Sequence, residues 1–101
     1  MVEVSAAKYD ITPEFPMYMR GYAMRTGKSI GVLDRLYCRA LCLRIDGEIF
    51  VWMTLDLCRL EELISDYVRG VVAAKYSVPV EHVILSTIHT HSGPDISFGD
   101  E

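Results

Sequence analysis

The chain has 101 residues and a formal net charge of -4; half of its residues are hydrophobic and 24% are charged. This length allows at most one small domain, and the negative charge gives no electrostatic footprint for DNA or RNA, so we expect no nucleic-acid partner. No apolar run approaches the ~18 residues of a membrane span, and residues 1–10 lack the basic and apolar regions of a signal peptide. We therefore expect a cytoplasmic protein without a transmembrane segment, whose three cysteines are free thiols.

The amino-terminal third predicts one strand and then a long connection. Residues 2–11 alternate loosely between apolar and polar side chains, which favours a strand that stops at Thr12-Pro13. No periodicity continues from there to Asp34. A connection of about twenty residues inside a small domain is usually functional or disordered, and the aromatic and methionine side chains in this one argue against disorder. We expect it to lie across the domain and to line a site.

The middle of the chain predicts a β-hairpin. Residues 36–45 and 48–57 are rich in strand-forming side chains, and Asp46-Gly47 joins them. An Asp-Gly pair is a strong hairpin signal because both turn positions need a positive φ.

A helix and a last strand follow the hairpin. Residues 59–76 repeat apolar side chains at helical spacing, and residues 82–88 form an apolar run. A strand, a helix and a strand in this order form a right-handed crossover, so the runs 48–57 and 82–88 should lie parallel in one sheet. The fold class is therefore α/β, on the border of α+β, with a mixed sheet of about four strands.

This arrangement leaves one face of the sheet without a cover. Residues 49–55 and 83–85 are apolar on both faces, which is typical of strands that are covered on both sides. One helix covers only one face, so either a partner, such as a second copy of the chain, or more polypeptide should cover the other. We expect residues 1–101 to be a single partial domain, a fragment of a larger one.

Residues 86–95 carry two of the three histidines, His89 and His91. On extended backbone, side chains at i and i+2 leave the same face, roughly 7 Å apart. Imidazole suits a borderline divalent ion such as zinc, and the carboxyl end of a strand is where open α/β sheets bind ligands. The sequence thus favours a metal site at His89 and His91, although a pair of histidines that merely caps a strand end is the commoner case.

Asp56 and Cys58 lie at the end of the neighbouring strand and are further candidates. If His89 binds metal, Asp56 is placed to accept the other ring N–H and to hold the tautomer. The competing interpretation, slightly favoured from sequence alone, is that Asp56 caps the helix that follows. Cys58 with His89 would suggest a thiol hydrolase, but a cysteine at such an apolar junction is usually inert core.

Five ordered blocks of sequence cover nearly the whole chain: residues 6–13, 19–29, 31–34, 55–57 and 87–94. The combination of His-Thr-His-Ser-Gly-Pro with Gly-Tyr-Ala is specific. Together the blocks resemble the amino-terminal part of the catalytic domain of the neutral/alkaline, non-lysosomal ceramidases. The second block contributes Arg20, Gly21 and Tyr22 as candidate substrate-binding residues, since its basic side chains beside aromatics suit a polar headgroup.

The resemblance implies a reaction and roles. In that family a zinc ion activates water for attack on the amide of an N-acyl sphingoid base, releasing a fatty acid and sphingosine. By resemblance, His89 is a direct zinc ligand, and His91 lines the pocket and can pass a proton to the leaving amine. The other family ligands, a histidine, a glutamate and a tyrosine, come from later sequence and have no counterpart here, so the isolated chain should be inactive. Members of the family are often secreted, and a different amide substrate stays open.

A second hypothesis comes from the uncovered sheet face alone. It describes the chain as a small, metal-free interaction domain that forms a defined oligomer by burying residues 49–55.

Overall fold

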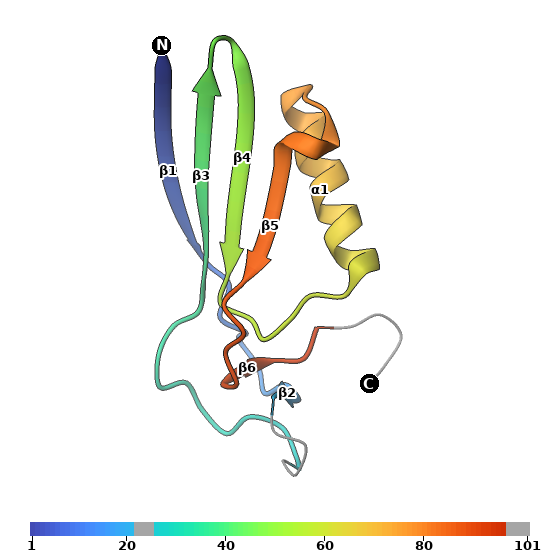
Figure 1. Cartoon of the computed structure of the whole chain (residues 1–101). Helices are drawn as coiled ribbons and strands as arrows, with labels where there is room; N and C mark the ends of the chain where they lie inside the picture. The colour runs from blue at the N-terminus through green and yellow to red at the C-terminus, as the bar shows by residue number, and fades with distance from the viewer. Residues whose placement is uncertain (22–25, 97–101) are drawn as a thin grey trace.

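Four strands form the main sheet of the protein, in the order β1-β3-β4-β5 (Figure 1). The structure is a computed structural model, and the description covers residues 1–21 and 26–96. In chain order, the elements are β1 (Val2–Asp10), β2 (Met19–Arg20), β3 (Tyr37–Ile45), β4 (Glu48–Leu55), the helix α1 (Glu62–Tyr76), a single 3-10 turn (Val80–His82), β5 (Val83–Thr87) and β6 (Gly93–Pro94).

The topology confirms the fold class predicted from the sequence. β3 lies antiparallel to both β1 and β4. The hairpin between β3 and β4 turns at Asp46 and Gly47, whose φ values are 51° and 87°, as the Asp-Gly signal requires. β5 returns through α1 to lie parallel to β4, with Leu55 opposite Thr87. The parallel pair therefore delivers the carboxyl ends of both strands to the same edge of the sheet, which is the lower end in Figure 1.

The helix begins later than the periodicity predicted. α1 starts at Glu62, with Glu61 in the extended conformation of the N-cap position. The prediction that Asp56 caps this helix is therefore wrong, because an irregular stretch separates the end of β4 from the first helical turn. That stretch contains the buried residues Leu57 and Cys58.

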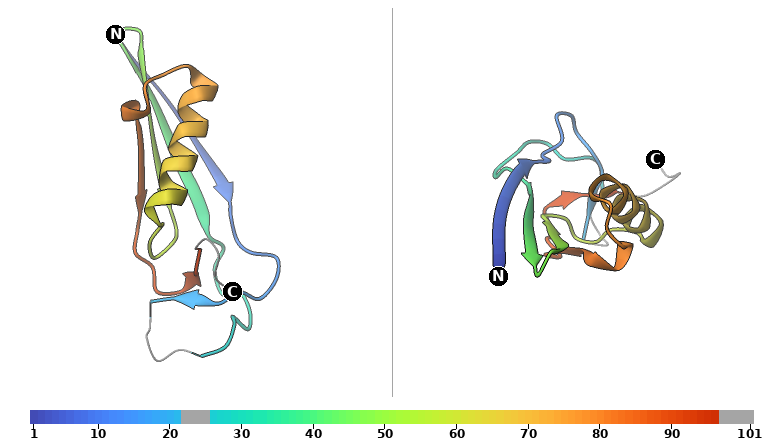
Figure 2. Two further views of the ribbon diagram at one scale, coloured as in Figure 1. Left: turned by 90° about the vertical axis from the view of Figure 1, so that its right-hand side faces the viewer. Right: turned by 90° about the horizontal axis from the view of Figure 1, so that it is seen from above.

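The buried core lies between the sheet and one side of α1. Val51 and Val83 form a facing pair in the parallel strands, and both are buried, as is Ala73 of the helix. Neighbouring pairs point to opposite faces of a sheet. The next pair, Trp52 and Ile84, accordingly faces away from α1 and is 48% and 49% exposed. Figure 2 shows α1 on one side of the sheet. Among residues 1–21 and 26–96, no element covers the face that carries Trp52 and Ile84, as the sequence predicted.

The long connection lies at the end of the sheet rather than over this uncovered face. It runs below the carboxyl ends of β4 and β5 in Figure 1, where its short strand β2 pairs with β6. Phe15 and Leu33 of this connection are 68% and 102% exposed. The expectation that the connection crosses the domain is therefore wrong in its placement, but the segment does border the histidine-bearing turn. No helix of the described residues has the length and hydropathy needed to cross a membrane.

Candidate metal centre

The backbone after β5 folds back onto the backbone after β4. The N–H of Ile88 donates to the carbonyl of Leu55 at 3.2 Å, and the N–H groups of His89 and Thr90 both donate to the carbonyl of Leu57, at 3.0 and 3.3 Å. One carbonyl oxygen thus holds two successive amides of the turn. The segment that carries His89 is fixed directly against the segment that carries Asp56 and Cys58.

The two histidines lie together, but not for the reason that the sequence suggested. β5 ends at Thr87, and His89 has a φ of 65°. The extended backbone assumed for His89 and His91 is therefore wrong. The turn nevertheless brings the two rings to a centroid distance of 5.2 Å, with an angle of 59° between their planes. A positive φ is uncommon for a residue with a side chain and is retained where surrounding contacts enforce it.

Gly21 makes room for His91. It precedes the segment outside the described residues and has a φ of 129°. A Cβ on Gly21 would lie 2.6 Å from Cγ of His91 and 2.8 Å from its Cβ. Any side chain at this position would collide with His91, so Gly21 lets the backbone after β2 pack directly against that residue. Gly21 was predicted to bind substrate, which stays a prediction; the structure places it against His91, another predicted site residue.

Arg20 connects the same two segments. Its Nη1 donates to Oδ1 of Asp95 at 2.7 Å, and both side chains are about one-third exposed. This hydrogen bond is the main cause that raises the pKa of Arg20 above its ordinary value. The ion pair joins β2 to the residue just after β6, and so supports the turn that carries His89 and His91. Arg20 was predicted to meet a substrate headgroup; its guanidinium is engaged with Asp95. Tyr22 lies outside the described residues.

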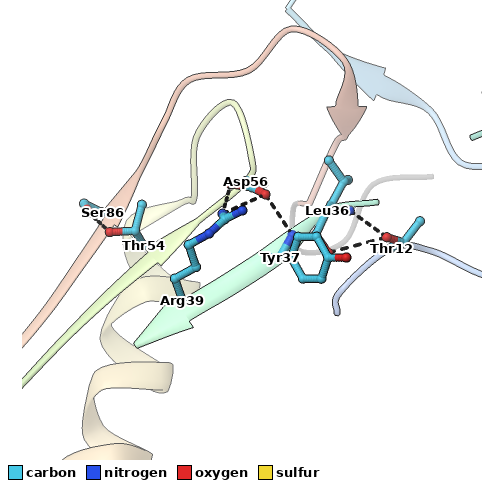
Figure 3. A network of polar contacts seen from close by, with 7 residues as sticks. All are labelled: Thr12, Leu36, Tyr37, Arg39, Thr54, Asp56 and Ser86. Atoms are coloured by element: carbon cyan, nitrogen blue, oxygen red, sulfur yellow. Dashed lines mark hydrogen bonds and ion pairs between the residues drawn. The ribbon is translucent and has the colours of Figure 1, made fainter. Parts of the chain in front are cut away.

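Asp56 is buried at the same edge and binds the start of β3. Its Oδ2 accepts the N–H of Tyr37 at 2.9 Å, and Nη1 of Arg39 donates to Oδ1 and Oδ2 at 2.9 and 3.1 Å (Figure 3). The backbone N–H of Asp56 also donates to the carbonyl of Tyr37 at 3.0 Å. Within the described residues, no hydrogen bond joins Asp56 to His89. Asp56 therefore supports the backbone of β3 and β4, and not the ring of His89 as expected.

Two further hydrogen-bonded pairs hold this edge of the sheet. The hydroxyl of Thr12 accepts the N–H of Leu36 at 2.7 Å, and the hydroxyls of Thr54 and Ser86 lie 3.1 Å apart across β4 and β5 (Figure 3). The first pair anchors the chain after β1 to the residue before β3. The second lies just before the two strand ends that lead to the site.

Cys58 is the residue that sequence reasoning undervalued. It is 4% exposed, as expected of core, yet its Sγ lies 3.8 Å from Nδ1 and 3.9 Å from Nε2 of His89. The signal for this contact lies in the parallel register. Leu55 pairs with Thr87, so Cys58 and His89 follow the same paired position by three and two residues, and their side chains meet beyond the sheet.

Cys58, His89 and His91 together form a potential metal-binding group. One ligand atom from each of the three lies within 4.8 Å of the other two. In a tetrahedral zinc site, sulfur and nitrogen ligand atoms lie about 3.5 Å apart. The separations between Cys58 and His89 are close to this value. A sulfur and two imidazole nitrogens are also the donor types that a borderline divalent ion prefers. The residues therefore fit zinc.

Comparison with known proteins matches nearly the whole chain to one family. Residues 3–99 match the family described as neutral/alkaline non-lysosomal ceramidase, N-terminal. The chain belongs to this family. The resemblance inferred from the five sequence blocks is thereby confirmed, as is their assignment to the amino-terminal part of a ceramidase.

Individual ceramidases show the same relationship. The neutral ceramidase of Oryza sativa subsp. japonica is 30% identical over 95 residues, which are 90% of this chain and 12% of the rice protein. The crystal structure of neutral ceramidase from Pseudomonas aeruginosa superposes with a TM-score of 0.82 and 31% identity, over 93% of this chain and 16% of that one. A ceramidase complexed with C2 gives the same score and identity and is covered to 15%. The chain thus spans a small part of the length of these ceramidases.

Proposed function

We propose that this chain supplies the first portion of the active site of a zinc-dependent amide hydrolase that cleaves N-acyl sphingoid bases to a fatty acid and sphingosine. Membership in the ceramidase family supports the reaction class. The observation that carries the proposal for this chain is the pair of imidazoles of His89 and His91, 5.2 Å apart at the carboxyl edge of the parallel strands. An edge of this kind is where open α/β sheets bind their ligands.

The two histidines take different roles in this proposal. His89 is the metal ligand, and its backbone is held by the carbonyl of Leu57. When bound, zinc polarises the amide carbonyl and lowers the pKa of a water molecule. His91 receives and donates a proton at the leaving amine nitrogen, a general acid–base role for which imidazole is suited near neutral pH. Gly21 holds His91 in place by direct backbone contact.

Asp56 and Arg20 act as positioning residues. Asp56 binds the N–H of Tyr37 and the side chain of Arg39, and so fixes the backbone from which Leu57 reaches the histidine turn. Arg20 fixes β2 against the chain that follows β6 through Asp95. Gly21 lies against His91, and we assign Gly21 and Tyr22 to substrate contact.

The test compares two histidine variants of the full-length gene product. His89→Gln is expected to lose bound zinc in elemental analysis and to lose hydrolysis of an N-acyl sphingoid substrate that carries a fluorescent acyl chain. His82→Gln is the matched control, since His82 stacks on Phe50 at the opposite end of β5. A wild-type protein without stoichiometric zinc would contradict the proposal, and so would zinc retention in His89→Gln together with full activity.

The 101-residue chain by itself is expected to be inactive. It contributes the imidazoles of His89 and His91, whereas the other family ligands come from later sequence. The matched residues are 12% of the rice ceramidase. Incubation of the isolated chain with zinc and the fluorescent substrate is the measurement. Turnover above the rate measured with free zinc alone would contradict the proposal that the chain holds only part of the active site.

The exposed apolar surface supports a second candidate function, a metal-free interaction domain that oligomerises. Trp52 and Ile84 lie on the uncovered sheet face beside a shallow hollow lined by Ala6 and Leu41. Leu63, Tyr67 and Val71 form an exposed stripe at four-residue spacing along α1. Such surfaces usually meet a partner or further polypeptide. A monodisperse monomer in sedimentation of the chain would exclude the oligomer, and a zinc-free oligomer that buries Trp52 would favour it.

A further inference from the structure

We propose that Cys58 is a positioning residue for His89: its thiol packs against the imidazole and fixes the direction in which the ring meets the metal, without itself binding the metal. The proposal rests on the proposed function, because it takes His89 as a metal ligand. It adds a buried side chain that determines how tightly His89 holds the ion. A cysteine beside a histidine also suggests a ligand or a nucleophile, and its position and burial exclude both roles.

The sulfur lies against the ring of His89 and not on one of its nitrogens. Sγ of Cys58 is 3.8 Å from Nδ1 and 3.9 Å from Nε2. Both distances are long for a hydrogen bond, and because they are nearly equal, the sulfur lies midway between the two nitrogens. It therefore contacts the ring as a whole, and sulfur makes favourable packing contacts with aromatic rings.

The donor types at this turn fit zinc, but the midway position separates Cys58 from the ligands. Imidazole binds zinc in the plane of the ring, about 2.0 Å from one nitrogen and away from the other. An ion so placed on either nitrogen of His89 would lie about 3 Å or more from the sulfur, whereas a zinc–sulfur bond is about 2.3 Å long. The contact with Cys58 therefore leaves both nitrogens to other partners, and one of these partners is the metal.

Burial excludes Cys58 as the nucleophile. A catalytic thiol must reach the carbonyl carbon of the substrate amide, and Cys58 is only 4% exposed. Its backbone is also tied to the histidine turn. The carbonyl of Cys58 accepts the hydroxyl of Thr87 at 3.3 Å, and the carbonyl of Leu57 accepts the N–H of His89 at 3.0 Å. A buried side chain on so fixed a backbone can support the ring but cannot reach a substrate.

His89 needs this support because its backbone hydrogen bond does not fix its ring. Its φ of 65° is uncommon for a residue with a side chain and is retained where contacts enforce it. The residue is exposed, and its ring can still turn about the side-chain bonds. Cys58 is the buried neighbour of this ring, whereas His91, whose ring centroid is 5.2 Å away, is itself partly exposed. Cys58 therefore provides the fixed surface against which the ring of His89 rests.

The zinc dissociation constant of the full-length gene product tests the proposal without a measurement of activity. We expect Cys58→Ala to raise this constant about 10-fold, the lower end of what the loss of a residue that orients a metal ligand costs. Competition with a chelator, well below the melting temperature of each variant, measures the affinity of the folded protein, so a loss of stability alone does not change it. Cys42→Ala is the matched control, since Cys42 is a half-buried cysteine in the middle of β3, and it should bind zinc as tightly as the wild type.

Cys58→Ser is the second variant, for use if Cys58→Ala does not fold. Its oxygen is smaller than sulfur and lies closer to the backbone, so the contact with the ring is also weakened and the dissociation constant should also rise. An unchanged zinc affinity in the folded variant overturns the positioning role of Cys58 and leaves the proposed function standing.

X-ray absorption of the zinc-loaded wild type needs no variant. Nitrogen and oxygen neighbours alone support the proposal. A sulfur scatterer at about 2.3 Å from zinc would make Cys58 a ligand and would overturn its positioning role. A wild-type protein that binds no zinc overturns both this inference and the proposed function.

Discussion

A Cβ on Gly21 would lie 2.6 Å from Cγ of His91, so the backbone of the glycine and the side chain of the histidine occupy adjoining space with no room for a methyl group. Gly21 directly follows β2, and His91 lies in the turn after β5. The contact therefore joins two parts of the chain that are 70 residues apart in the sequence. The imidazole of His91 can therefore keep its position only if residue 21 is a glycine.

Gly21→Ala is expected to displace His91 and to lower the activity of the full-length gene product by about 100-fold, since a misplacement of about 1 Å can cost this much. Gly27→Ala is the control for backbone strain. Gly27 also has a positive φ, 77°, but its added Cβ would meet nothing within 4 Å. Equal losses in the two variants would show that the strain of a positive φ, rather than contact with His91, causes the effect.

Asp56→Ala is expected to destabilise the fold by about 1–3 kcal/mol, because the N–H of Tyr37 would lose its acceptor at a buried site. Arg39→Ala should cost less, about 0–1 kcal/mol, since the Arg39 side chain is 51% exposed and solvent screens its ion pair. Urea denaturation of the two variants measures both free energies. A larger effect for Arg39 than for Asp56 would contradict the assignment of the buried hydrogen bond as the stronger contact.

The pH dependence of stability should carry a contribution from Asp10. Hydrogen bonds from Thr12 and from Arg35 lower the pKa of Asp10 from 3.8 to about 2. Because the folded pKa is the lower one, the unfolded chain takes up the proton first. The contribution is therefore complete above about pH 4 and disappears as the pH falls towards 2. Asp10→Asn removes it, so the gap in urea midpoint between wild type and variant should close on acidification. A gap that is constant with pH would contradict this account.

The thiol of Cys38 should react more slowly with iodoacetamide than that of Cys42 at mildly alkaline pH. Burial, and secondarily the charge of Asp56, raises the pKa of Cys38, so less of it is thiolate, the reactive form. Mass spectrometry of peptides after timed alkylation measures both rates in the same sample. Both cysteines lie in β3 and are half-buried, and faster reaction of Cys38 than of Cys42 would contradict the expectation.

The fold was predictable where local chemistry and topology agree. Asp46 and Gly47 specify the hairpin, and the apolar spacing of residues 59–76 specifies a helix that must cross over to a parallel strand. The start of that helix was not predictable, because Leu60 continues the apolar pattern although the chain becomes helical only at Glu62. Tertiary contacts hold the intervening residues: the carbonyl of Leu57 accepts amides of the histidine turn.

At the candidate site, the closeness of the two histidines was predictable, but their geometry was not. Their i, i+2 spacing predicted closeness through an extended backbone, whereas a turn brings the rings together, and that turn depends on contacts with Leu57, which lies far away in the sequence. The sequence interpretation of Cys58 as inert core depended on its apolar neighbours. Its meeting with His89 depends on the parallel register, which no local pattern contains. For the same reason, the use of Asp56 by Tyr37 and Arg39 could be found only from the structure.

The shared acceptor at Leu57 has a dynamic consequence. The N–H groups of His89 and Thr90 both donate to its carbonyl oxygen, so a local opening that frees one amide also frees the other. Their hydrogen–deuterium exchange should then proceed as one event with a common protection factor. The histidine turn would detach as a unit from the segment that follows β4.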